Sequence, residues 1–157
     1  VLLMAQFLLS VPIVPVPASR PRFSRFGKPY YGKNYTAFRR EATRYLESEL
    51  FRDALEQSGI RFPLLGSLRL TAVYIVAKPK TSKREWPVGD VDNYLKTLDV
   101  FNGVLWHDDD QITVMEGRKI WGDPQIHLAI EYNEQQQVRP SRAMPKMRLK
   151  GQPVKVR

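Results

Sequence analysis

The segment that most constrains the fold is residues 67–77, S-L-R-L-T-A-V-Y-I-V-A, in which apolar residues occupy both alternating series. Leu68, Leu70, Ala72 and Tyr74 fall on one side of an extended chain, and the other side is also mostly apolar. Such a pattern is typical of a central strand that is covered on both faces. The segment therefore predicts a sheet with this strand inside it, in a chain whose 157 residues suit one domain.

The remaining elements follow from periodicity and from breaking residues. Residues 35–58 repeat an apolar side chain every four positions and stop at Gly59, which predicts one long helix. A second helix is expected over residues 91–105. Strands are expected over residues 6–16, where three prolines confine the strand to an edge or end it early, and over residues 111–119 and 125–132. From residue 133 to residue 157 the chain is polar, basic and aperiodic, which predicts a flexible tail that adds phosphate affinity.

Charge and composition narrow the possible partners. The net charge is +9 and the pI is about 9.9, which indicates a polyanionic partner, most simply nucleic acid. The chain has no cysteine and two histidines, which excludes thiolate chemistry and disfavours a histidine-built metal centre. Any metal ion would be held by oxygen, as magnesium, manganese or calcium are. The apolar start lacks a basic leader and is interrupted by prolines, so neither export nor membrane spanning is expected.

Basic residues alternate with aromatic residues in two loops. In residues 18–34 the bases are interleaved with Phe23, Phe26, Tyr30 and Tyr31, an arrangement that suits DNA contact, although for each aromatic alone packing against the core is the preferred reading. The second loop is residues 78–89, K-P-K-T-S-K-R-E-W-P-V-G. Its Trp86 either stacks on an exposed DNA base or has an ordinary packing role within the protein. Arg39, Arg40 and Arg44 could extend a DNA-binding face, but a solvated helix face is the preferred reading. The candidate DNA-binding residues are Arg20, Arg22, Arg25, Lys28, Lys80, Lys83, Arg84, Trp86 and Lys119.

The acidic stretch of residues 86–112 carries the candidate chemistry. If Gly89 permits a turn and Asp90 caps the following helix, the Asp90 carboxylate can converge with Asp92, and Lys96 lies one turn further on the same face. One aspartate of residues 108–110 would join them if the next strand returned beside the helix mouth. Magnesium suits such a site, since it would polarise a phosphate and activate water while Lys96 stabilised developing charge.

Plainer explanations exist for each part of this stretch. An aspartate at a helix start is often only a cap, and three consecutive aspartates are often a solvated turn. Their joint occurrence with Lys96 in a basic chain favours the metal site. An EF-hand is excluded because Tyr94 occupies a ligand position.

Two motifs carry a resemblance to a known family. The run G-D-V-D-N-Y-L-K from Gly89, followed by N-G-V-L-W-H-D-D-D-Q-I from Asn102, resembles the RusA family of Holliday junction resolvases, and the early R-P-R-F resembles its basic loop. The resemblance implies metal-binding carboxylates at Asp90, Asp92 and, by alignment on Gln111, Asp109. It implies a catalytic lysine at Lys96. The extra aspartate leaves the third ligand open among residues 108–110.

The resemblance also implies a fold and an assembly. It implies one α+β domain over residues 6–132, with a mixed sheet packed against two main helices, which acts as a homodimer in the cytoplasm of a bacterium or phage-infected host. Two symmetric nicks in a four-way junction require two active sites related by a two-fold axis. The expected function is therefore a Mg²⁺-dependent endonuclease, with Mn²⁺ as the other ion, that resolves Holliday junctions.

Two other functions stay open at this point. One is a less selective branched-DNA or flap endonuclease of phage DNA processing. The other is a basic nucleic-acid-binding protein in which the aspartates only cap and solvate. The presence of every motif residue, Lys96 included, argues against the second, because carboxylates weaken a phosphate-binding surface.

Overall fold

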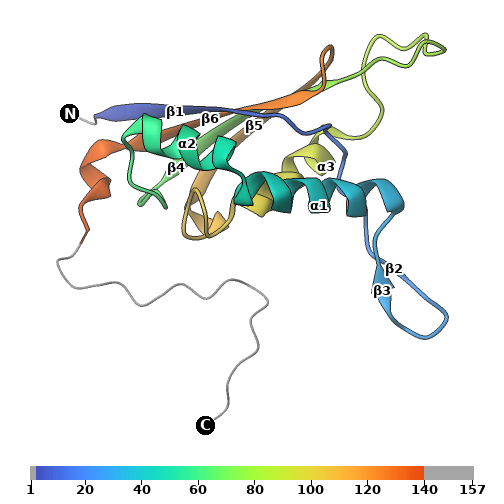
Figure 1. Cartoon of the computed structure of the whole chain (residues 1–157), viewed down its shortest axis with the longest axis horizontal. Coiled ribbons are helices and arrows are strands. Elements are labelled where there is room, and N and C mark those ends of the chain that lie inside the picture. The colour runs from blue at the N-terminus through green and yellow to red at the C-terminus, as the bar shows by residue number, and fades with distance from the viewer. Residues whose placement is uncertain (1–2, 140–157) are drawn as a thin grey trace.

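The computed structural model describes residues 3–139, and a four-stranded sheet is its main feature (Figure 1). The strands lie in the order β1 (Met4–Val11), β6 (Gln125–Asn133), β4 (Leu68–Val76) and β5 (Ile112–Trp121). β6 pairs antiparallel with both β1 and β4, whereas β4 and β5 are parallel. The predicted α+β class and mixed sheet are confirmed, with β1 at an edge and β4 inside.

Only one face of β4 is closed by the helices. Leu68, Leu70, Ala72 and Tyr74 are at most 1% exposed and face the core, while Val73 and Ile75 on the other face stay partly exposed. The prediction that β4 is covered on both sides was wrong for this second face. β6 and β5 flank β4 edge to edge, and this lateral pairing gives its second face partial shelter without a covering layer.

The long helix predicted over residues 35–58 is two helices, α1 (Lys33–Glu47) and α2 (Glu49–Ser58). Ser48 between them is extended, with φ −78° and ψ 154°. Its hydroxyl donates to the Tyr45 carbonyl at 2.6 Å and accepts the Phe51 N–H at 3.3 Å. The break lets Phe51 pack on Tyr45, with ring centroids 5.1 Å apart, while Gly59 ends α2 with φ 67° as predicted. The four-residue apolar repeat runs across Ser48, so periodicity alone did not show the break.

The second predicted helix, residues 91–105, is also shorter. It consists of α3 (Val91–Leu95) and the 3₁₀ segment η1 (Lys96–Phe101), after which Asn102 is extended and Gly103 has φ 80°. The Thr97 hydroxyl donates to the Tyr94 carbonyl at 2.6 Å, a local bond that accompanies the tighter winding. The apolar residues of this segment form its buried side: Tyr94, Leu98, Phe101 and Leu105 are at most 2% exposed, and Leu95 is partly buried.

The ends of the domain differ from the prediction. β1 ends at Val11 rather than at residue 16, because Pro12 offers no N–H to the sheet. Residues 133–139, predicted as the start of a tail, form η3 (Glu134–Gln137) and bind the core: the Gln137 amide exchanges hydrogen bonds with the Leu65 backbone at 2.7 and 2.9 Å. The rest of the predicted tail, residues 140–157, lies outside the described residues.

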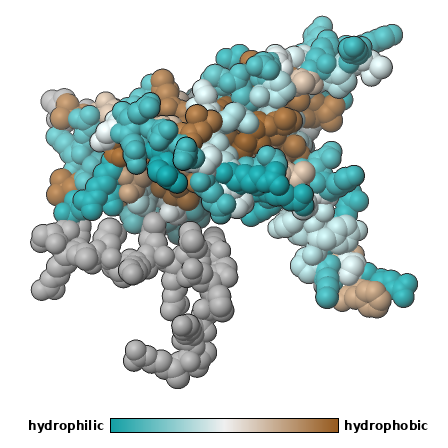
Figure 2. All heavy atoms as spheres, in the orientation of Figure 1, coloured by the Kyte–Doolittle hydropathy of each residue, from teal (hydrophilic) through white to brown (hydrophobic). Residues whose placement is uncertain are grey.

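Two segments extend from the body at the same end of its long axis (Figure 1). One is the hairpin of β2 (Arg22–Phe23) and β3 (Pro29–Tyr30), and the other is the loop between β4 and α3. Both present largely hydrophilic surface (Figure 2). None of the helices in residues 3–139 has the length and apolar character needed to cross a membrane.

The cap at Ser48 makes a stability prediction. Ser48→Ala removes both hydroxyl bonds that hold the break between α1 and α2. We expect the free energy of unfolding in urea to fall by about 1 kcal/mol. Ser48→Thr retains the hydroxyl and is the matched control; an equal loss in both variants would contradict the capping role.

Candidate active site

The site lies on the crossover that joins β4 to β5, residues 77–111. Parallel neighbours need such a connection because the chain must return to the same end of the sheet. Gly89 turns the chain into α3 with φ 96°, a backbone conformation that favours glycine. Asp90 follows as the extended N-cap, and its carbonyl accepts from the Asn93 and Tyr94 N–H groups at 3.1 and 3.3 Å. The predicted turn and the N-cap position of Asp90 are confirmed, but the Asp90 side chain makes no capping hydrogen bond to α3.

Lys119 of β5 binds the backbone that leads into this cap. Its ammonium donates to the Pro87 carbonyl at 2.8 Å and to the Gly89 carbonyl. The side chain is thus committed to the backbone directly before Asp90. Its predicted role as a DNA contact is untested, but the structure gives it a positioning role that sequence reasoning missed.

A cavity of about 680 Å³ opens between α1, the α3–η1 segment and the start of β5. Asp92, Lys96 and Asp99 line one side of it, with Asp92 and Lys96 one helical turn apart as predicted, and Asp109 lines it from the far end of the crossover. Arg39 of α1 also lines it, 3.7 Å from Asp99, and aromatic and aliphatic side chains such as Tyr31 and Leu95 complete the lining. The cavity therefore combines charged groups of both signs with an apolar floor.

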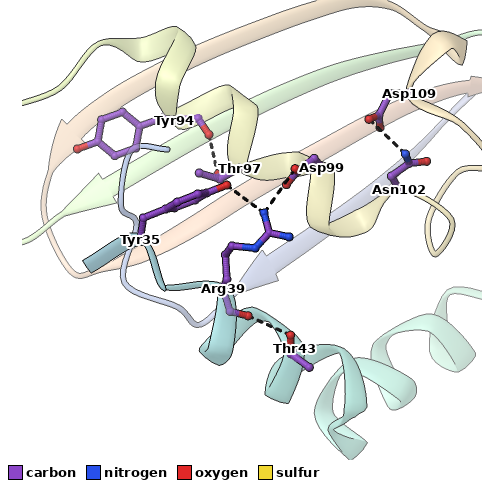
Figure 3. Close-up of polar contacts among 8 residues, drawn as sticks. All are labelled: Tyr35, Arg39, Thr43, Tyr94, Thr97, Asp99, Asn102 and Asp109. Carbon is purple, nitrogen blue, oxygen red and sulfur yellow. Dashed lines mark hydrogen bonds and ion pairs between the residues drawn. The ribbon is translucent and has the colours of Figure 1, made fainter. Parts of the chain in front are cut away.

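Asp109 is the aspartate of residues 108–110 that faces this cavity. Its carboxylate accepts from Trp106 Nε1 at 2.8 Å and from Asn102 Nδ2 at 3.3 Å, and Asn102 approaches it from the end of η1 (Figure 3). Trp106 is fully buried, so its donor is fixed in place. Sequence reasoning missed both partners, although Trp106 three residues before Asp109 was a usable signal.

Asp108 and Asp110 have other surroundings. Asp108 caps the short 3₁₀ turn η2 (Asp109–Gln111), where its Oδ1 accepts the Asp110 N–H at 3.2 Å. Gln111 returns the bond, since its Oε1 accepts the Asp108 N–H at 2.9 Å. Asp110 is exposed, and neither it nor Asp108 lines the cavity.

The structure does not gather Asp90, Asp92 and Asp109 into one cluster. Among residues 3–139, no three acidic, histidine or cysteine side chains are grouped closely enough to hold a metal ion, and Asp90 is outside the cavity lining. The reason is the direction of β5: Lys119 reaches Gly89 and Gly117 faces Leu95, so Asp109 lies toward the far end of the helical segment, beside Asn102. The expectation that the strand returns beside the helix mouth was wrong for Asp109.

The donor set still suits one kind of ion. Asp92 and Asp109 offer carboxylate oxygens to one cavity, whose lining holds no cysteine or histidine and, as sulfur, the Met115 thioether. Mg²⁺ binds through one or two carboxylates and completes its shell with water and substrate phosphate. The residues therefore fit Mg²⁺, and the assignment of Asp90, Asp92 and Asp109 as ligands stays a prediction.

Lys96 sits at the centre of the acidic wall. Its Nζ donates to Asp92 Oδ2 at 3.3 Å and to Asn93 Oδ1 at 3.1 Å. This i, i+4 pairing is the arrangement predicted from the spacing. An ammonium has three N–H donors, so one remains for a group that enters the cavity.

Arg39 is a cavity residue that sequence reasoning placed on a solvated face. Its Nη1 donates to Tyr35 Oη at 3.2 Å and lies 3.7 Å from Asp99 Oδ2 (Figure 3). The hydrogen bond to Tyr35 raises the pKa of Arg39 above its usual value, against the lowering effect of partial burial. The available signal was its position four residues after the buried Tyr35, at the border of the apolar stripe.

The candidate DNA-binding residues lie mainly on the two extensions. Arg22 lies on strand β2 of the hairpin, and Arg25 packs over Phe26 with its guanidinium 5.0 Å from the ring centre. Phe23 and Phe26 are 69% and 78% exposed, so the preferred reading that each packs against the core was wrong. Arg20, Lys28, Lys80 and Lys83 are likewise exposed.

Trp86 lies in the second extension, the loop between β4 and α3. It is 56% exposed, and the Arg84 guanidinium lies 6.0 Å from its ring centre. Of the two roles left open for Trp86, packing in the core does not describe its position. An exposed aromatic next to a basic side chain is suited to stacking on a nucleobase.

Comparison with known proteins adds one finding to this geometry. The family model described as Endodeoxyribonuclease RusA matches residues 12–131, which include the cavity, the hairpin and both motifs. A search of curated proteins found no significant match.

The contacts of Lys119 make a structural prediction. Lys119→Met should free the backbone of residues 87–89 and loosen the first turn of α3. We expect the Asn93 and Tyr94 amides, which bond to Asp90, to exchange hydrogen about tenfold faster. Lys78→Met removes the same charge from an exposed position and is the control; unchanged exchange in Lys119→Met would refute the positioning role.

Proposed function

This chain belongs to the RusA family of endodeoxyribonucleases, and from that premise we propose that it resolves four-way DNA junctions by paired symmetric nicks that depend on Mg²⁺. The observation that carries the proposal is the one cavity that Asp92, Lys96 and Asp109 all line. Carboxylates for a hard cation and a lysine for phosphate charge are the groups that phosphodiester hydrolysis needs.

The carboxylates and their hydrogen-bond partners have different roles in this proposal. Asp92 and Asp109 would hold the ion, with Asp90 at the α3 cap as the third predicted carboxylate. When bound, Mg²⁺ supplies Lewis-acid activation of the phosphate and of the attacking water. Trp106 and Asn102 keep the Asp109 carboxylate fixed, so that it need not reorient during the reaction.

Lys96 acts on the substrate in this proposal. Its ammonium already faces the cavity and keeps one donor beyond its bonds to Asp92 and Asn93. That donor stabilises negative charge on the phosphate as the strand is cut. Removal of Lys96 therefore affects the chemical step more than DNA binding.

The two extensions supply DNA binding. The hairpin and the loop of residues 77–90 lie at the same end of the molecule (Figure 1). Both contain basic residues, and exposed aromatic residues occur among these in the sequence. The bases neutralise phosphates, and the aromatics offer stacking surfaces to unpaired bases at the branch point. Recognition of a junction then rests on the shape of the DNA backbone.

Cleavage of a labelled four-way junction tests the site. Asp92→Asn and Asp109→Asn should each lower the cleavage rate in Mg²⁺ by about a thousandfold or more while junction binding is retained, and EDTA should abolish cutting by the unmodified protein. Asp110→Asn is the matched control, because Asp110 is exposed outside the cavity.

Other outcomes of the same assay decide between functions. Equal cutting of a linear duplex would indicate a less selective nuclease. Tight junction binding without metal-dependent cutting would indicate a DNA-binding protein. Loss of cutting in Asp110→Asn with full activity in Asp109→Asn would show that the third carboxylate is misassigned.

The proposed homodimer has its own test. A supercoiled plasmid with a cruciform receives both nicks within one binding event only if two active sites act together. We expect linear product from the unmodified protein and nicked circles from heterodimers with one Asp92→Asn subunit. Linear product from such heterodimers, or a monomer in sedimentation on the junction, would contradict the paired arrangement.

A further inference from the structure

Arg39 is oriented toward the carboxylate site by the helix that carries it. Tyr35, Phe38, Ala42 and Tyr45 form the buried side of α1, and Arg39 lies one turn after Tyr35 at the border of that side. Its guanidinium extends toward η1 and lines the same cavity as Asp92, Lys96 and Asp109 (Figure 3). The side chain thus reaches the site from α1 and meets Asp99 of η1 there.

The guanidinium is held in this orientation before any substrate enters. Nη1 donates to Tyr35 Oη at 3.2 Å, contacts Asp99 Oδ2 at 3.7 Å, and the group lies 5.7 Å from the centre of the Tyr35 ring. Tyr35 is buried and packs between Tyr31 and Phe38, with ring centroids at 5.2 and 6.3 Å. A restrained arginine loses less side-chain entropy on binding, which favours a preformed contact.

Pairing with Asp99 alone does not account for this arrangement. The two side chains are 45% and 48% exposed at a separation of 3.7 Å, and such ion pairs contribute little to stability. Within residues 3–139, the hydrogen bond and ion pair of the Arg39 side chain both use Nη1. Nη2 and Nε therefore remain as donors, in the planar fork that matches two oxygens of a phosphate.

The charges of the cavity lining point to an anion at this place. Three aspartates and two bases line it, so a DNA phosphate that approaches the carboxylates meets net repulsion unless cations face it. Lys96 is engaged with Asp92 on the acidic wall. Arg39 offers positive charge from α1, beside the aspartates that line the cavity.

We propose that Arg39 binds a backbone phosphate of the cleaved strand through Nη2 and Nε, and that Tyr35 and Asp99 position its guanidinium for this contact. The inference rests on the proposed function, since it adds a substrate contact to the same cavity. The contact belongs to the guanidinium and does not require the metal ion. Arg39 therefore offsets the negative charge of the carboxylates and also positions the cleaved DNA strand next to them.

The salt dependence of junction binding in EDTA tests the proposal without cleavage. Arg39→Gln should weaken binding about tenfold and lower the slope of log K against log salt concentration by about one, as loss of one phosphate contact does. Arg39→Lys should keep the slope but lose part of the affinity, because the charge remains and the fork is gone. Tyr35→Phe removes the hydroxyl that holds Nη1 and should weaken binding in the same direction by a smaller factor.

Arg40→Gln is the matched control. It removes the same charge from the next residue of α1, which is exposed and outside the cavity lining, and should leave the slope unchanged. An unchanged slope in Arg39→Gln, or an equal drop in both variants, would overturn the proposal. Urea unfolding of each variant separates loss of the contact from loss of the fold.

Neutral phosphate substitutions locate the contact. A single methylphosphonate is placed at each position of the cleaved strand in turn. At one position it should weaken junction binding by the unmodified protein about tenfold. At that position it should not weaken binding by Arg39→Gln any further. Additive effects at every position would overturn the proposal. If the unmodified protein binds junctions but does not cut them in Mg²⁺, the proposed function fails while the Arg39 contact is still decided by these binding data.

Discussion

The parallel pairing of β4 with β5 is the constraint on which the rest of the structure depends. Because both strands start at the same end of the sheet, residues 77–111 must cross back over its face, and they carry the acidic motifs with them. The crossover helix then runs antiparallel to β5, with Leu95 over Gly117 and Gly89 against Lys119. That direction sets Asp92 and Asp109 along one cavity instead of at one point.

The buried core fixes the walls of this cavity. The apolar face of β4 packs against residues of α1 and η1, so the two helical segments lie on the same side of the sheet. Tyr35 and Trp106 each use an apolar ring for packing and a polar group for the site: Tyr35 accepts from Arg39, and Trp106 donates to Asp109. Each of these two side chains therefore serves both the packing of the core and the positioning of a site residue.

Sequence reasoning reached the elements with local causes. The alternation of residues 67–77 identified the inner strand, Gly89 and Asp90 identified the start of α3, and alignment on Gln111 selected Asp109, the aspartate that faces the cavity. It missed the breaks at Ser48 and Leu95, since an apolar repeat continues across both. Hydroxyl-to-carbonyl bonds accompany both breaks, but Thr43 makes such a bond to the Arg39 carbonyl inside α1 without a break, so a hydroxyl residue in the sequence does not reveal one.

The sequence by itself determined the chemistry: which residue types are present, their spacing within one turn of helix, and a basic chain with a local acidic stretch. These are properties of neighbouring residues, which chain geometry fixes within a few ångströms. Only the tertiary structure decided which distant groups meet. It brought Arg39 into the cavity, turned Lys119 toward the backbone before Asp90, and left Phe23 and Phe26 exposed. These outcomes depend on strand direction and on the packing of α1 on the sheet, which the whole core sets.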